Sequence, residues 1–294
     1  MFDLRYHVAS LTAVFVALVV GILVGVGLSG KGFVNDAERS NLNNQIADLR
    51  NERDSARASL DQATKGALAL KDFSDSAYPA VVPGRLAGQK VAVLYAGPVD
   101  RGVSFAVEKA VRDAGGNVVR VRSLEVPIDV KAMEEALKRI PGQKRLLGTE
   151  HLDNLGNALA FEFAAGGKTP LWDALGKTMV QERDGSSTPT ADALVVVRTA
   201  KPQQGPTRTF LTGLYDGLGR AGEPAVGTEV PGAAPSAFPI FVKSGLSTVD
   251  SIDTSTGRLG LVLLLQGAQP GSYGLGDLAK DGVLPPIPPV ATQQ

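Results

Sequence analysis

The sequence predicts an α/β protein that opens with a transmembrane helix and continues through a coiled-coil helix into a three-layer domain with a mainly parallel sheet. Three observations predict this order. An uncharged apolar run opens the chain, a polar stretch with heptad spacing follows it, and short apolar strands then alternate with helices. Strands that alternate with helices favour a parallel sheet covered on both faces. The predicted boundaries are 1–7 for a short head, 8–28 for the transmembrane helix, 33–76 for the coiled-coil helix, 86–284 for the α/β domain and 285–294 for a Pro-rich tail.

The apolar run at residues 8–28 contains no charged side chain, and its only polar residues are Ser10 and Thr12. A helix of this length spans the roughly 30 Å hydrocarbon core of a bilayer. A cleaved signal peptide would need a basic start, a shorter apolar core and a small-residue cleavage site. Here Asp3 offsets Arg5, and no A-x-A site follows the run. We therefore predict a retained single-pass anchor in the cell membrane.

Small residues recur every four positions along this anchor and share one face of the helix. They are Ala13, Ala17, Gly21 and Gly25. Such a face lets two helix backbones approach closely, as in G-x-x-x-G dimers, and so favours a homodimer. The alternative interpretation is that Ala and Gly are simply common in transmembrane helices. Charge counting does not favour a cytoplasmic N-terminus, because basic residues lie on both sides of the run.

Heptad spacing begins at Leu42, with alternating steps of four and three residues and charges of both signs in between. A helix this polar is unstable alone and needs a partner helix. The predicted partner-binding seam consists of Leu42, Ile46, Leu49, Arg53, Ala56, Leu60 and Ala63. The seam is weak, because alanines bury little area and Arg53 must snorkel out or pair with an acid. Three arrangements fit: a parallel homodimer, a site for another protein's helix, or a stalk that folds back on its own domain.

The remaining chain predicts an alternation of strands and helices that is typical of a Rossmann-like or flavodoxin-like domain. The predicted strands are 89–96, 117–122, 193–198 and 224–228, and the predicted helices are 105–114, 130–140, 150–165 and 208–220. We expect the coiled-coil helix to end between Tyr78-Pro79 and Pro83-Gly84, because proline cannot continue it. The run from Leu259 to Leu265 is ambiguous between a helix and a buried strand.

Composition excludes several classes of function. Thirty basic residues balance thirty acidic ones, without a basic stripe that would bind nucleic acid. The absence of cysteine excludes thiol catalysis and Cys-ligated zinc. His151 has no second histidine in the α/β domain with which to complete a triad or a metal site. We predict no enzyme, no catalytic residue, no cofactor and no metal site.

Two glycine loops could suggest ligand binding. Gly166-Gly167-Lys168-Thr169 is similar to the end of a P-loop, but Glu162 stands where the motif needs glycine, and the segment closes a helix. We interpret the glycine pair as a helix C-terminus. Gly97-Pro98-Val99-Asp100 follows the first strand, where doubly wound folds bind ligands, but it lacks G-x-G-x-x-G. We interpret it as an ordinary βα loop.

The opening stretch FDLRYHVASL, from Phe2 to Leu11, is followed by Ala13-Val14-Phe15 and Gly21-Ile22. It resembles the opening of the actinobacterial MctB/SteB envelope family. Val249-Asp250-Ser251-Ile252-Asp253-Thr254 and Gly271-Ser272-Tyr273-Gly274 are similar to the family's C-terminal pattern, which often carries His where this chain has Ser272. The resemblance implies a helical 259–265 segment, a cytoplasmic N-terminus and an extracytoplasmic bulk.

The resemblance implies two different functions. One is MctB-type copper transport or copper homeostasis in the envelope. The other is a bitopic scaffold that recruits a SteA-like membrane protein and indirectly controls a peptidoglycan hydrolase during cell separation. Copper transport needs clusters of Cys, Met or His, but Met133, Met179 and His151 are scattered in the sequence. We therefore predict the scaffold, with copper as the alternative and a ligand-sensing α/β domain as a third hypothesis.

Overall fold

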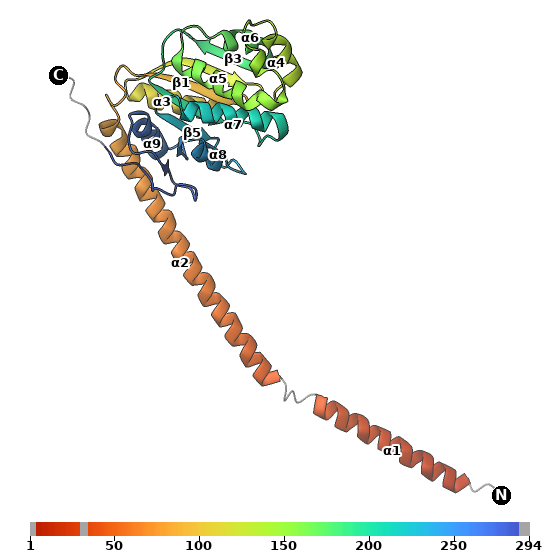
Figure 1. Ribbon diagram of the computed structural model, residues 1–294. Helices are drawn as coiled ribbons and strands as arrows, with labels where there is room; N and C mark the ends of the chain where they lie inside the picture. The colour runs from red at the N-terminus through yellow and green to blue at the C-terminus, as the bar shows by residue number, and fades with distance from the viewer. Residues whose placement is uncertain (1–3, 30–34, 288–294) are drawn as a thin grey trace. The chain divides into compact units, whose positions relative to one another are not determined.

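The structure is a computed structural model, and it describes residues 4–29 and 35–287 (Figure 1). Residues 1–3 of the predicted head, 33 and 34 of the predicted coiled coil and 288–294 of the predicted tail lie outside the described residues. The chain divides into two compact units, Met1–Leu68 and Ala69–Gln294. The division falls within one helix, α2 (Asn35–Val81), so each unit is described separately.

The first unit contains α1 (Leu4–Ser29) and most of α2. Within α1, Tyr6–Gly27 spans 22 residues with a mean hydropathy of 2.6, which is long and apolar enough to cross a membrane. The hydroxyls of Ser10 and Thr12 donate to the backbone carbonyls of His7 and Val8, at 3.1 and 2.8 Å. These bonds satisfy the polar side chains within the helix, as a lipid environment requires. The helix therefore fits the predicted membrane anchor.

The second unit is built on a seven-stranded sheet with the order β3-β2-β1-β4-β5-β6-β7 among the described residues. All neighbouring strands are parallel except β3, which runs antiparallel to β2. The strands are β1 (Lys90–Ala96), β2 (Asn117–Leu124), β3 (Val180–Gly185), β4 (Ala193–Arg198), β5 (Ala225–Glu229), β6 (Ser247–Val249) and β7 (Ser272–Tyr273). The predicted α/β class with a mainly parallel sheet is confirmed.

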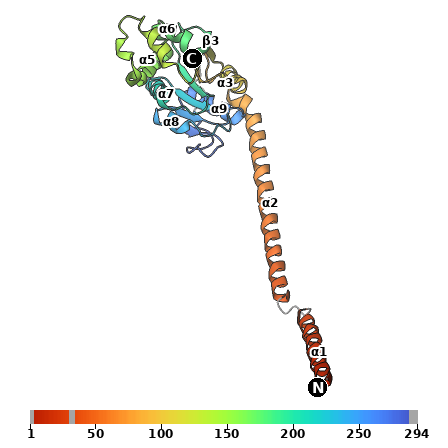
Figure 2. The ribbon, with the colours of Figure 1, turned by 90° about the vertical axis from the view of Figure 1, so that its right-hand side faces the viewer.

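Helices cover both faces of this sheet, with α3 and α9 toward one side and α5, α7 and α8 toward the other (Figure 2). The helices are α3 (Arg101–Asp113), α4 (Val130–Leu137), α5 (Leu152–Ala165), α6 (Pro170–Met179), α7 (Gly205–Gly219), α8 (Phe238–Lys243) and α9 (Ser255–Leu265), with short 3₁₀ turns at Lys144–Leu146 and Thr149–His151. Alternate residues of each strand point to opposite faces. Val91 and Val93 accordingly join the cluster with α3 and α9, whereas Ala92 and Leu94 join the cluster with α5 and α7.

The last turns of α2 pack on α9, within the second unit. The Ser255 hydroxyl donates to Asp75 at 2.6 Å, and the Thr256 hydroxyl donates to Ser74 at 2.9 Å. The Arg258 guanidinium lies over the Tyr78 ring, 5.3 Å from its centroid. The helix continues through Pro79 and ends at Val81, inside the interval predicted from the sequence.

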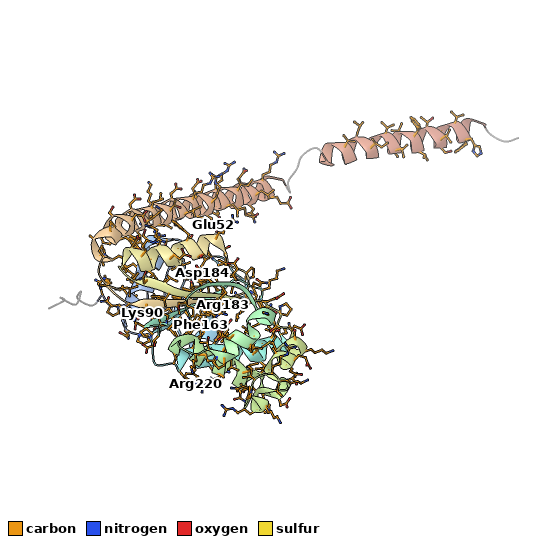
Figure 3. All side chains as sticks on the ribbon, turned by 90° about the horizontal axis from the view of Figure 1, so that it is seen from above. Glu52, Lys90, Phe163, Arg183, Asp184 and Arg220 are labelled. Carbon is orange, nitrogen blue, oxygen red and sulfur yellow. The ribbon has the colours of Figure 1, made fainter. Side chains whose placement is uncertain are left out.

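Two arginines on β2 bind the connection between β3 and β4. Arg120 is 2% exposed and donates to the carbonyls of Phe163, Ser186, Ser187 and Pro189. Arg122 donates to the Asp184 carbonyl at 2.7 Å and to the Ser187 hydroxyl at 2.8 Å. Burial lowers the pKa of Arg122 to about 10. Figure 3 labels Phe163 and Asp184 at this corner, where carbonyl oxygens replace the water that buried guanidinium groups lose.

Most predicted elements are present, with shifted ends. Strands 89–96 and 193–198 correspond to β1 and β4, and the 259–265 segment lies in α9 and is helical, as the family resemblance implied. Helices α6 and α8 and strands β3, β6 and β7 were not predicted from the sequence. Strand β3 is mostly exposed and polar, and β6 and β7 are only 3 and 2 residues long. Such strands carry no alternating apolar signal.

Helices α5 and α7 approach so closely that only glycine fits at their contact. A Cβ atom on Gly156 would overlap the Phe210 carbonyl, and one on Gly213 would overlap the Asp153 carbonyl. These neighbours are backbone atoms, which cannot move aside for an added methyl group as the end of a flexible side chain can. The glycines therefore fix the distance between the two helices that cover one face of the sheet.

We expect Gly213→Ala to lower the free energy of unfolding by about 1–3 kcal/mol, because the added methyl group overpacks the α5–α7 contact. Denaturant unfolding of the full chain, followed through Trp172, measures this change. Gly176→Ala in α6 is the matched control, since its Cβ would come no closer than 3.9 Å to the Arg183 side chain. The control should be neutral or stabilising by up to about 1 kcal/mol. Equal effects of the two substitutions would contradict this interpretation of the contact.

Candidate functional site

The candidate site is the predicted seam on α2. Its seven residues lie on one uninterrupted helix of 47 residues, and their 4-3 spacing places them on one stripe of its surface. The large apolar side chains of this stripe are exposed in the single chain: Leu42 by 55%, Ile46 by 44%, Leu49 by 63% and Leu60 by 65%. Ala56 and Ala63 are also exposed. An exposed apolar stripe of this kind is a candidate surface for contact with another helix.

Arg53 interrupts the stripe with a charge. Its Nε and Nη2 atoms both donate to the Asp54 carboxylate, at 2.9 and 2.7 Å. Both side chains are more than half exposed, so this ion pair contributes little to stability. The pair nevertheless draws the guanidinium toward a flanking residue, which is one of the two arrangements that the sequence suggested for Arg53.

The small residues of α1 form the second predicted surface. Ala13, Ala17, Gly21 and Gly25 occupy successive positions on one face of the helix and are exposed in the single chain. A Cβ atom added at Gly21 or Gly25 would meet nothing within 4 Å. The small side chains therefore leave a shallow groove along this face, the α1 groove, into which another backbone could fit.

Among the described residues, no group of three or more His, Cys, Asp or Glu side chains is placed to hold a metal ion. Met133 on α4 and Met179 on α6 are each 1% exposed within the core, where thioethers commonly fill irregular space. His151 lies before α5, with its side chain 41% exposed and 3.8 Å from Glu150.

The two glycine loops have structural roles. Gly166 and Gly167 end α5 with φ angles of 65° and 75°, as the sequence predicted for a helix C-terminus. The Glu162 carboxylate accepts from the backbone N–H groups of Leu171 and Trp172 and so caps α6. In the loop after β1, the Asp100 carboxylate accepts from Val103 N at 2.9 Å and caps α3.

The C-terminal pattern also has a role that the sequence analysis missed. The Asp250 carboxylate accepts from the backbone N–H groups of Leu275 and Gly276, at 2.7 and 2.8 Å. Thr254 accepts from Gly257 N at 3.0 Å and caps α9. This pattern therefore ties the end of β6 to the loop after β7. An Asp and a Thr that precede an apolar helix are an ordinary capping signal, which could have suggested part of this role.

The profile of the family described as "Copper transport outer membrane protein, MctB" matches residues 1–284. Proteins named Copper transporter MctB from Mycobacterium bovis and Mycobacterium tuberculosis are each 26% identical to this chain over 311 aligned residues. The alignments cover 94% of this chain and 97% of each relative, so the similarity includes the apolar helix, α2 and the α/β domain. The chain belongs to the MctB family.

Proposed function

We propose that this protein is a non-enzymatic, membrane-anchored scaffold of the cell envelope. Its α2 seam dimerises or recruits a SteA-like membrane partner, and through that partner it controls peptidoglycan hydrolysis during cell separation. The observation that carries the proposal is the exposed apolar stripe on α2, which follows a helix that fits a membrane anchor. The proposed orientation places the N-terminus in the cytoplasm and the α/β domain outside.

The energetics of the stripe support helix binding. Full burial of one Leu or Ile side chain is worth roughly 1.5–3 kcal/mol. The side chains of Leu42, Ile46, Leu49 and Leu60 are 44–65% exposed, so a partner helix that covers them gains several kcal/mol in total. The α1 groove adds a second contact of a different kind, in which small residues let two copies pack backbone to backbone.

We expect the double substitution Leu49→Asp and Leu60→Asp to reduce capture of the SteA-like partner at least tenfold, because it places two carboxylates in the apolar stripe. Co-purification from solubilised membranes measures the capture. Asn51→Asp with Gln62→Asp is the matched control, since it adds the same charge two positions after each of the two substituted leucines, outside the seam. The melting temperature of both variants should match that of the original chain. Undiminished capture by the seam variant would locate the interface elsewhere.

A second prediction concerns the α1 groove. The double substitution Gly21→Leu and Gly25→Leu should weaken self-association of the anchor severalfold in a membrane two-hybrid reporter. The two leucine side chains would hold the backbones of the paired helices apart. Gly27→Leu is the control, since position 27 lies off the stripe of small residues. An unchanged reporter signal for the double variant would show that the stripe is not a packing face.

Copper homeostasis is the second candidate, and the family description and the names of both relatives favour it. Direct transport would need soft ligands brought together, and no group of three or more His, Cys, Asp or Glu side chains in the described part of the chain is placed to hold a metal ion. The scaffold proposal therefore predicts no saturable copper site tighter than about 1 μM on a folded chain.

Titration of the full chain in lipid nanodiscs with Cu(I) and Cu(II), against competing chelators and with empty nanodiscs as reference, tests this expectation. Weak, unsaturated uptake that His151→Gln does not change is the expected result. Saturable binding of one copper per chain would support the copper function instead. Its loss in the His151→Gln variant would then identify the first ligand.

A further inference from the structure

A cavity of about 270 Å³ opens at the carboxyl ends of β1 and β4, where Ala96 and Arg198 end their strands. These two strands are neighbours, and the sheet order reverses between them, because β2 lies on one side of β1 and β4 lies on the other. Open α/β sheets bind ligands in the crevice outside such a reversal. The loop between β4 and α7, helix α7, the segment before α8 and α8 itself supply the remaining walls.

The walls of this cavity are largely apolar and include Leu211, Tyr215 and Ile240. Its charged residues are all cations: Arg198, Lys201 and Arg208, without an Asp or Glu in the lining. Among the described residues, neither Lys201 nor Arg208 has a carboxylate within ion-pair distance. The cavity therefore combines an apolar body with an excess of positive charge.

The Arg198 side chain is buried in the wall of the cavity and is held there by hydrogen bonds. It is 8% exposed, and its Nη2 atom donates to Glu229 and to the Pro235 carbonyl, both at 2.7 Å. Glu229 in turn accepts from Ala237 N at 2.8 Å. This chain of bonds fixes the guanidinium and the backbone segment that closes the cavity. Since Glu229 neutralises Arg198, the uncompensated charge is that of Lys201 and Arg208.

We propose that this cavity binds a small organic anion, with a carboxylate facing Lys201 and Arg208 and an apolar ring or short chain against Leu211 and Ile240. The volume lies just below the roughly 300–1,000 Å³ of drug-sized sites, so the ligand has about a dozen non-hydrogen atoms. Contact with the apolar walls supplies most of the affinity for the ligand. The two cations favour an anionic ligand over a neutral ligand of the same shape. The site is independent of the α2 seam, and its test does not depend on the scaffold function.

Naphthalene-2-carboxylate and naphthalene-2-carboxamide are suitable probes, because they share one shape and differ in charge. Calorimetric titration of the full chain in nanodiscs, with empty nanodiscs as reference, measures binding of each. We expect one carboxylate per chain, bound at least tenfold more tightly than the carboxamide. No saturable carboxylate binding up to about 1 mM, or equal affinity for both probes, would overturn the proposal.

Substitutions then locate the binding. Lys201→Gln with Arg208→Gln should weaken carboxylate binding at least tenfold and leave carboxamide binding unchanged. Arg220→Gln with Lys243→Gln removes the same charge outside the lining, at exposed positions near the ends of α7 and α8, and should change neither (Figure 3 labels Arg220). Thr212→Trp fills the cavity and should abolish binding of both probes. Full binding by a folded Thr212→Trp chain, or equal losses in the two charge variants, would overturn the assignment.

Discussion

Burial of the central strands on both faces is the constraint on which the α/β domain depends. Every residue of β4 is buried, and alternate residues of β1 serve two separate apolar clusters. A strand covered on both sides needs helices on both sides, and the α5–α7 glycine contact and the α3–α9 pair supply them. Residues 38–68 of α2 add no buried side chain, so the buried core of the described residues lies in the second unit.

The same constraint explains where the domain departs from an apolar pattern. Strand β2 lies between β1 and the exposed edge strand β3, and its Arg120 and Arg122 are buried without a bonded carboxylate among the described residues. Their guanidinium groups instead donate to backbone carbonyls of Phe163 in α5, of Asp184 in β3 and of the β3–β4 connection. Buried cations of this kind are tolerated only when hydrogen bonds replace their hydration, so the loop and the arginines require each other.

The sequence predicted those parts of the structure that are marked by a long uncharged apolar run, by heptad spacing or by a short β-branched run between turn residues. The α1 run, the heptad stripe of α2 and the β1 and β4 strands all belong to this class. The LGLVLLL run of α9 could not be assigned from periodicity, because a fully apolar segment has no preferred face, and the family resemblance was needed. The cavity was not predictable either. Arg198, Arg208 and Ile240 are separated in the sequence, and the packing of β4, α7 and α8 around one crevice brings them together.

The weakness of the α2 seam is consistent with a regulatory scaffold. A seam filled with Leu and Ile would hold two copies together permanently, whereas Ala56, Ala63 and the charge of Arg53 reduce the apolar area that a partner can bury. A charged residue in a helix interface also restricts register and partner, since a wrong alignment leaves the charge unpaired. Because Arg53 already bonds Asp54 in the single chain, a partner must either preserve that pair or offer its own carboxylate at this level. A partner of the proposed scaffold would therefore bind this surface selectively and reversibly.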